Sequence, residues 1–194
     1  MFYKSLFTAF LFGCYLLVST FAQAEIPEKY QSAGDPAKGK KMLSENGGVY
    51  KHLFKAEYTG QPGSFEAENV LEVVSITDTT AYVRILTYFA NYHKCDFTEV
   101  FEYKASGDLI AVSQPYPGAD LCVLKMQNSA GKIKFFEESP VPFACKSYCG
   151  VNGQLTATDF ALNTKREIRY VQRLKNSSEY QEALRSYAER FKRN

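Results

Sequence analysis

The stretch FTEVFEYKASGDLIAVS, residues 97–113, places two runs of strand-forming residues around the turn Ser106-Gly107-Asp108. The runs 97–105 and 109–113 on either side of this turn predict an antiparallel hairpin. Similar runs lie before and after it in the chain, at residues 49–58, 69–77, 80–90, 121–127 and 132–138. About seven short strands with turns roughly every eight to twelve residues are typical of an antiparallel barrel or sandwich.

The spacing of apolar residues changes at the C-terminal end of this strand region. A capping box that begins at Thr164 predicts a helix over residues 165–175, and another that begins at Asn176 predicts a helix over residues 177–192. We therefore predict an α+β fold that is mainly β, in which an antiparallel barrel-like sheet carries a C-terminal helical pair. These elements form a single domain over residues 48–194.

The segment before the first strand has a different composition. Residues 25–47 are polar and rich in lysine, which predicts an N-terminal arm. Asp35 followed by Pro36 predicts a short helix over residues 36–44, because aspartate caps helices and proline is favoured at their first position.

Residues 1–24 have the composition of a secretory signal peptide. Lys4 precedes an uncharged apolar run, residues 5–21, and small residues surround a cleavage site after Ala24. Cleavage there leaves 170 residues, which we expect to be periplasmic or secreted and to contain no transmembrane segment. Two alternatives remain: a retained membrane anchor, and a lipobox that would make Cys14 a lipidated N-terminus.

Charge is distributed unevenly along the chain. Residues 164–194 carry nine basic and four acidic side chains. We interpret this basic segment as the solvated face of a helix and predict no binding of nucleic acid. Contact with phosphates or acidic lipid is the alternative.

Four cysteines remain after removal of the signal peptide: Cys95, Cys122, Cys145 and Cys149. An even number in an exported chain predicts two disulfides, for which three connectivities are possible. We expect at least one long-range bridge from the loop ACKSYCG, residues 144–150, to Cys95 or Cys122. A bridge from Cys95 to either cysteine of this loop is favoured.

A zinc site is the alternative use of the cysteines. His93, Cys95, Cys145 and Cys149 supply one imidazole and three thiolates, which is an acceptable zinc set. This set leaves Cys122 unexplained and lacks the close C-x-x-C spacing of common zinc motifs, so we predict no metal and no cofactor.

The sequence contains few groups that could perform catalysis. It has two histidines, no H-E-x-x-H, no G-x-S-x-G and no phosphate-binding glycine loop. His52 lies on the apolar face of a predicted strand and is interpreted as structural. His93, in the polar turn ANYHKC, is the remaining candidate for chemistry or binding. We predict that the protein is not an enzyme.

Several segments resemble those of a known group of proteins when they are taken in order: YFANYHKCDFTEVFEY, LCVLK, CKSYCGVNGQL and REIRYVQRLKNSSEYQEAL. They resemble uncharacterised exported bacterial proteins that share N-G-H-x-C, C-x-L, C-x-x-Y-C-G-A-R-G and I-R-Y motifs, over most of residues 48–184. The chain departs at Tyr92, where the group tends to have glycine, and at Val151-Asn152, where it tends to have Ala-Arg. The resemblance implies an exported β domain stapled by cysteines and brings no established activity.

A small exported β-barrel with disulfides is also similar in outline to the bacterial periplasmic lysozyme inhibitors, which carry a Ser-Gly-x-x-Tyr loop. Ser106 and Gly107 match the start of that loop, whereas Ile110 stands in the place of the tyrosine. The resemblance implies Ser106 and Gly107 as binding residues. Tyr116, among the prolines of the turn 114–120, is a further candidate because rigid aromatic side chains suit interfaces.

These observations favour an exported, non-enzymatic binding or inhibitory protein. Its expected partner is another exported protein, such as a cell-wall hydrolase or a toxin. Two alternatives stay open: a zinc-dependent enzyme that uses His93 and the cysteines, and a structural component of the cell envelope attached through the basic residues 164–194.

Overall fold

Each strand pairs with its neighbours in the sequence. The computed structural model describes residues 26–191, which contain an eight-stranded antiparallel sheet in the order β1-β2-β3-β4-β5-β6-β7-β8. The strands are β1 (Gly48–Glu57), β2 (Ser64–Ser75), β3 (Thr80–Tyr88), β4 (Lys94–Tyr103), β5 (Leu109–Ser113), β6 (Cys122–Ser129), β7 (Lys132–Glu137) and β8 (Phe160–Ala161). The predicted fold class, an antiparallel barrel-like sheet with C-terminal helices, is confirmed. The predicted signal peptide, residues 1–24, and Cys14 lie outside the described residues.

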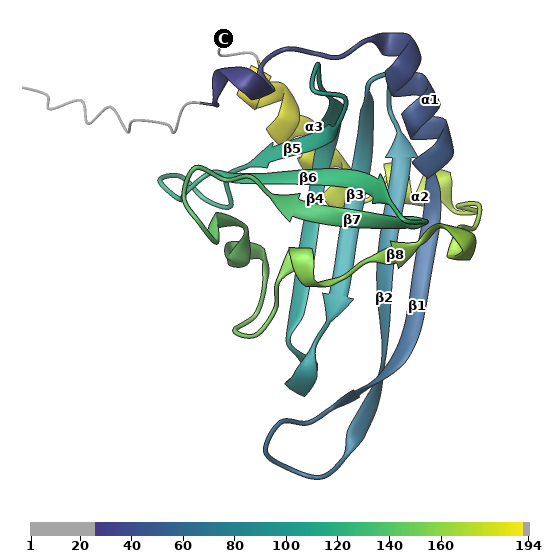
Figure 1. Ribbon diagram of the computed structural model, residues 1–194, viewed down its shortest axis with the longest axis vertical. Coiled ribbons are helices and arrows are strands. Elements are labelled where there is room, and N and C mark those ends of the chain that lie inside the picture. Colours follow the sequence, from purple (N-terminus) through teal and green to yellow (C-terminus); the bar gives the residue numbers. More distant parts are fainter. Residues whose placement is uncertain (1–25, 192–194) are drawn as a thin grey trace, which may run out of the picture.

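The sheet is nearly closed into a barrel. Val49 of β1 exchanges two backbone hydrogen bonds, each 2.9 Å long, with Arg166, which follows β8 in the chain. Strands β1 to β4 are long and run side by side, whereas β5 to β8 cross them at a steep angle (Figure 1). The side chains between the two groups of strands form the main core, which includes Leu71, Phe101 and Leu124.

Strands β4 and β5 separate soon after the turn that joins them. They pair only through Glu102 with Ile110 and Tyr103 with Leu109, whereas β3 and β4 pair along the whole of β3. The barrel wall is therefore interrupted between the first part of β4 and the end of β5, and we call this gap the β4–β5 seam. Because buried backbone groups need hydrogen-bond partners and cores are close-packed, other parts of the chain must fill the seam.

The segment before β1, the predicted N-terminal arm, packs on the barrel. Ile26 and Tyr30 are buried against the outer side of β5 and β6. The predicted helix is confirmed as α1 (Pro36–Asn46), and the side chain of Asp35 accepts a hydrogen bond of 3.0 Å from the backbone N–H of Lys38. Two apolar anchors in a polar segment carry no periodic signal, which explains why sequence reasoning missed this packing.

The first C-terminal helix is much shorter than the predicted helix over residues 165–175. The predicted start of this helix is therefore wrong, whereas its predicted end agrees with the structure. α2 (Val171–Lys175) begins late because the backbone of Arg166 is extended in its pair with Val49. The hydroxyl of Thr164 donates to a backbone carbonyl at 2.8 Å instead of capping a helix. Barrel closure therefore overrides the capping-box signal at this position.

The second C-terminal helix, α3 (Ser178–Phe191), agrees with the predicted range 177–192. Its first turn is capped by Ser177, whose Oγ accepts a hydrogen bond of 3.2 Å from the backbone N–H of Tyr180. The ring of Tyr180 packs against Tyr82 on the outer face of β3, with 4.8 Å between ring centroids. No helix within residues 26–191 has the length and apolar character needed to cross a membrane.

Candidate binding surface

The loop ACKSYCG is bonded to the barrel through both of its cysteines. Cys145 forms a disulfide with Cys122 at the start of β6, and Cys149 forms one with Cys95 near the start of β4. The expected bridge between Cys95 and this loop is confirmed, and the second bridge also joins the loop to a strand. We call residues 138–154 the disulfide loop.

The central turn of the disulfide loop, η3 (Ala144–Tyr148), places Tyr148 in the β4–β5 seam. The ring of Tyr148 makes an edge contact with Phe97 of β4, with 4.7 Å between ring centroids. Its hydroxyl is hydrogen-bonded to Ser113 at the end of β5, and Ser113 donates to Glu99 of β4. A serine hydroxyl has one proton, so Tyr148 is the donor to Ser113.

Glu99 is a carboxylate in the barrel wall whose side chain is only 8% exposed. Arg190, near the end of α3, reaches it with 2.6 Å between Nη2 and Oε2. The series Tyr148, Ser113, Glu99 and Arg190 thus connects the disulfide loop to α3 through the seam. Burial of an ion pair costs several kcal/mol of desolvation, roughly offset only where the geometry and the remaining hydrogen bonds are good.

Burial in the seam also affects the ionisation of Tyr148. Burial raises the pKa of Tyr148 to about 12, and burial likewise raises the pKa of Tyr50 to about 12. The unfolded chain ionises these phenols near pH ~10, before the folded chain does. We therefore expect the folding stability present below pH ~10 to fall as the pH rises from ~10 to ~12, because only the unfolded state loses the protons.

Ultraviolet absorbance of tyrosinate, followed during an alkaline titration alongside circular dichroism, measures this effect. A group of the tyrosines should ionise only together with unfolding, and Tyr148→Phe should reduce that group by one. Ionisation of every tyrosine near pH ~10 in the folded protein would contradict the expectation.

Large apolar side chains are exposed on and beside the disulfide loop. Of the seven such side chains exposed in the described part of the chain, four lie between residues 136 and 151: Phe136, Val141, Phe143 and Val151. Phe136 and Phe143 line a pocket of about 520 Å³, whose floor includes Cys145 and Leu155. Exposed apolar side chains gathered around a hollow mark interaction sites more often than scattered ones do. We call Phe136, Val141, Phe143 and Val151 the apolar loop surface.

Phe143 is the most unusual residue of this surface. It is 68% exposed and has φ 64° and ψ 16°, in the left-handed region that bulky residues avoid. A left-handed conformation costs a non-glycine residue about 1 kcal/mol or more. The short loop between Cys122–Cys145 and β7 holds the backbone in this conformation, and the aromatic ring therefore points to solvent at a cost in stability.

A second aromatic group lies where the β1–β2 and β3–β4 turns meet. Tyr92 is 56% exposed with φ 58°, and its ring stacks on Phe65 with 3.8 Å between centroids. Tyr58 contacts both rings. The side chain of Asn91 accepts a hydrogen bond of 2.8 Å from the backbone N–H of Thr59, which fixes the two turns to each other.

The binding residues expected from the sequence do not come together. Ser106 and Gly107 form the β4–β5 turn, where Gly107 has φ 89°. His93 lies at the opposite end of β4, which spans about 30 Å. Tyr116 is 63% exposed in the β5–β6 loop. These residues therefore lie on three different turns.

His93 sits beside Gly150, where a Cβ atom on the glycine would lie 3.1 Å from Nδ1 of the histidine. It cannot share a zinc ion with thiolates of the described residues, because the four cysteines within 26–191 are paired in disulfides. The zinc alternative thus loses the ligands on which it was based. Within residues 26–191, no three His, Cys, Asp or Glu side chains are placed to hold a metal ion.

His52 is exposed and stacks on Phe54, so it is not the buried residue that its strand position predicted.

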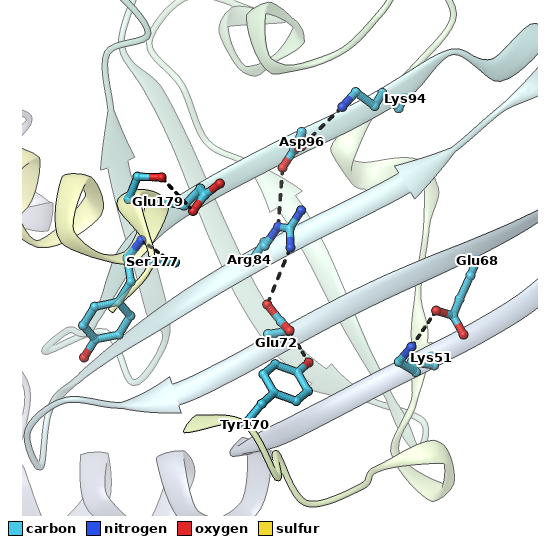
Figure 2. Close-up of polar contacts among 11 residues, drawn as sticks. Lys51, Glu68, Glu72, Arg84, Lys94, Asp96, Tyr170, Ser177 and Glu179 are labelled. Carbon is cyan, nitrogen blue, oxygen red and sulfur yellow. Dashed lines mark hydrogen bonds and ion pairs between the residues drawn. The ribbon is translucent and has the colours of Figure 1, made fainter. Parts of the chain in front are cut away.

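A smaller pocket of about 180 Å³ lies between the outer face of β2 and β3 and the C-terminal helices. Figure 2 shows its polar groups: Glu72 accepts a hydrogen bond from Tyr170 and lies 4.0 Å from Nη1 of Arg84. Nε of Arg84 lies 3.7 Å from Oδ1 of Asp96. Each charge already faces an opposite charge or a donor, so this network holds the helices on the sheet.

Comparison with known proteins gives no relative: a scan against family models and searches of curated proteins and of solved structures found no match.

The sequence analysis did not predict that Phe136, Val141 and Phe143 are surface residues. For Val141 and Phe143 a signal was present in SPVPFAC, residues 139–145, where two prolines prevent a strand and leave these two apolar residues in a loop.

Proposed function

We propose that this chain is a non-enzymatic binding or inhibitory protein whose partner contacts the apolar loop surface. The observation that carries the proposal is the exposure of Val141, Phe143 and Val151 on a loop that two disulfides hold, together with a pocket that Phe143 lines with the exposed Phe136 of β7. Exposed aromatic residues on a rigid loop are effective binding anchors, because little conformational freedom is lost on association.

Rigidity of the loop supports this role. Each end of η3 is bonded to a different strand, and Tyr148 between them is fixed in the seam by Phe97 and Ser113. Phe143 is exposed and its left-handed backbone lowers the stability of the fold. A purely structural role does not explain this loss of stability. Because strained residues are common at functional sites, the observed strain at Phe143 supports a binding role.

We propose that the partner is another exported protein, with cell-wall hydrolases and toxins as the first classes to examine. Two long-range disulfides are typical of proteins of oxidising compartments, and the predicted signal peptide leads to the same compartment, periplasmic or secreted. The basic segment 164–194 offers weaker support for envelope attachment, since Arg190 is paired with Glu99 in the seam.

Mixing the purified protein with a panel of peptidoglycan hydrolases tests the proposal. Phe143→Asn is expected to weaken a complex about 30-fold, equivalent to about 2 kcal/mol for an interface anchor, and to preserve the fold because asparagine tolerates the left-handed conformation. Tyr116→Asn is the matched control, since Tyr116 is equally exposed on another loop.

Binding by titration calorimetry and inhibition of hydrolysis give the readouts. The proposal fails if no member of the panel is bound or inhibited, or if Phe143→Asn binds as tightly as the native protein. Loss of binding in Tyr116→Asn alone would move the site to the β5–β6 loop.

A further inference from the structure

One edge of strand β1 has no partner strand over most of its length. β1 pairs with β2 along all ten of its residues, while its other edge is paired only where Val49 meets Arg166. In an antiparallel strand, alternate residues direct N–H and C=O to the same edge. Lys51, Leu53 and Lys55 therefore present their backbone groups to the same side as Val49, as does Glu57, and no strand within residues 26–191 covers them.

The exposure of this edge is visible in the fold. Leu53 is 66% exposed, and His52, Lys55 and Glu57 are also exposed. In Figure 1 the part of β1 beyond β8 runs along the border of the molecule with no neighbour on its outer side. A long strand with unpaired backbone groups is a template for pairing with another chain.

We propose that β1 joins two copies of this chain, edge to edge and antiparallel, about a twofold axis that passes beside Phe54. The available segment begins after Val49, which Arg166 occupies, and ends at Glu57, where the strand ends. The outward-facing residues of this segment run from Lys51 to Glu57 and have Phe54 as their midpoint, so this register pairs all of them with those of the second copy. The four outward-facing residues of each copy would form about eight backbone hydrogen bonds between the copies.

The side chains support this register. Lys51 of one copy lies opposite Glu57 of the other, and this pair of opposite charges occurs twice because of the twofold axis. Leu53 lies opposite Lys55, whose aliphatic stem can cover it. Phe54 meets Phe54 of the second copy in a non-hydrogen-bonded position, where side chains are closest and aromatic pairs are favourable.

Neighbouring registers are worse. A twofold axis at Leu53 places Lys51 opposite Lys55, and an axis at Lys55 places that residue opposite its own copy, so both set like charges against each other. Within one copy, Lys51 is bonded to Glu68 at 2.6 Å (Figure 2), and this contact can be shared with Glu57 of the other copy. Charge complementarity thus selects a second copy of this chain in one register.

A cysteine placed on the axis tests the register directly. In Phe54→Cys the two Cα atoms would be about 4.5 Å apart, a separation that disulfides accept, so mild oxidation should give a covalent dimer. In the control His52→Cys the two cysteines would be more than about 13 Å apart and should not join. Mass spectrometry of non-reduced peptides identifies the bond and separates it from exchange with the native disulfides.

Equilibrium sedimentation of the protein without added cysteines measures association itself. Leu53→Pro removes an outward N–H without touching the β1–β2 bonds and should weaken the dimer at least 10-fold, while Leu53→Ser retains that N–H and should weaken it less. The proposal is overturned by a monomer at all concentrations, or by equal cross-linking of Phe54→Cys and His52→Cys.

The dimer is independent of the binding role proposed for the disulfide loop. That loop lies on the opposite side of the barrel from β1 in Figure 1, so both copies would keep it accessible. Phe143→Asn should therefore leave the extent of dimer formation, measured by equilibrium sedimentation, unchanged. A shift to monomer in that variant would show that association uses the apolar loop surface instead of β1.

Discussion

Replacement of Cys95 and Cys149 together by alanine is expected to lower the free energy of unfolding by about 4 kcal/mol. The two cysteines are 54 residues apart, and their bond closes a large loop in the unfolded chain. The bridge Cys122–Cys145 closes a loop of 23 residues, for which the expected loss is about 3.4 kcal/mol. Urea denaturation of each double variant, followed by circular dichroism, measures the difference.

Each double variant removes two buried or half-buried sulfur atoms as well as a bond, so the comparison between the two variants controls for lost packing. Reduction of the native protein gives a third measurement with all side chains retained. If the variant lacking the shorter bridge is the less stable one, the chain-entropy explanation is incorrect and local packing around Cys145 dominates.

Arg190→Met is expected to destabilise the protein by about 3–5 kcal/mol, because it leaves Glu99 buried without its cation. Glu99 accepts from Ser113 and Arg190, and its side chain is 8% exposed. An isolated buried carboxylate must take up a proton or open the seam to water. Chemical denaturation near neutral pH measures the loss.

The double variant Glu99→Gln with Arg190→Met separates the buried charge from the packing of α3. An amide can still accept from Ser113, so this variant should recover most of the stability that Arg190→Met loses. An undisturbed Arg190→Met, or a double variant as unstable as the single one, would show that the ion pair carries little energy.

Most strands follow from local sequence because each pairs with its neighbour along the chain. Predicted and observed ranges of β3 and β5 differ by two residues or fewer at each end. β2 starts at Ser64, five residues before its predicted start, because Phe65 and Ala67 alternate with glutamates that made the segment look like a loop. β8 has two residues, too few for any periodic signal.

The candidate surface depends on contacts between distant residues, which local patterns do not encode. Tyr148 fills a seam that exists only because β4 before Glu102 and β5 after Ile110 diverge. Glu99 falls on the apolar side of its strand, between Phe97 and Phe101, and its partner Arg190 lies 91 residues away. Tyr92 has a positive φ of 58°, a conformation that glycine adopts most readily, so the local sequence does not predict a tyrosine there.

The connectivity of the two bridges has a consequence for how the molecule matures. Chains are made from the N-terminus, so Cys95 and Cys122 become available before either of their partners, which lie in the last quarter or so of the described chain. Oxidation in order of appearance would join Cys95 to Cys122, a pair absent from the folded protein. Such a bond must be exchanged through a mixed disulfide once Cys145 and Cys149 arrive. If the cysteines oxidise in that order, correct assembly needs a cellular environment that reshuffles disulfides as well as forming them.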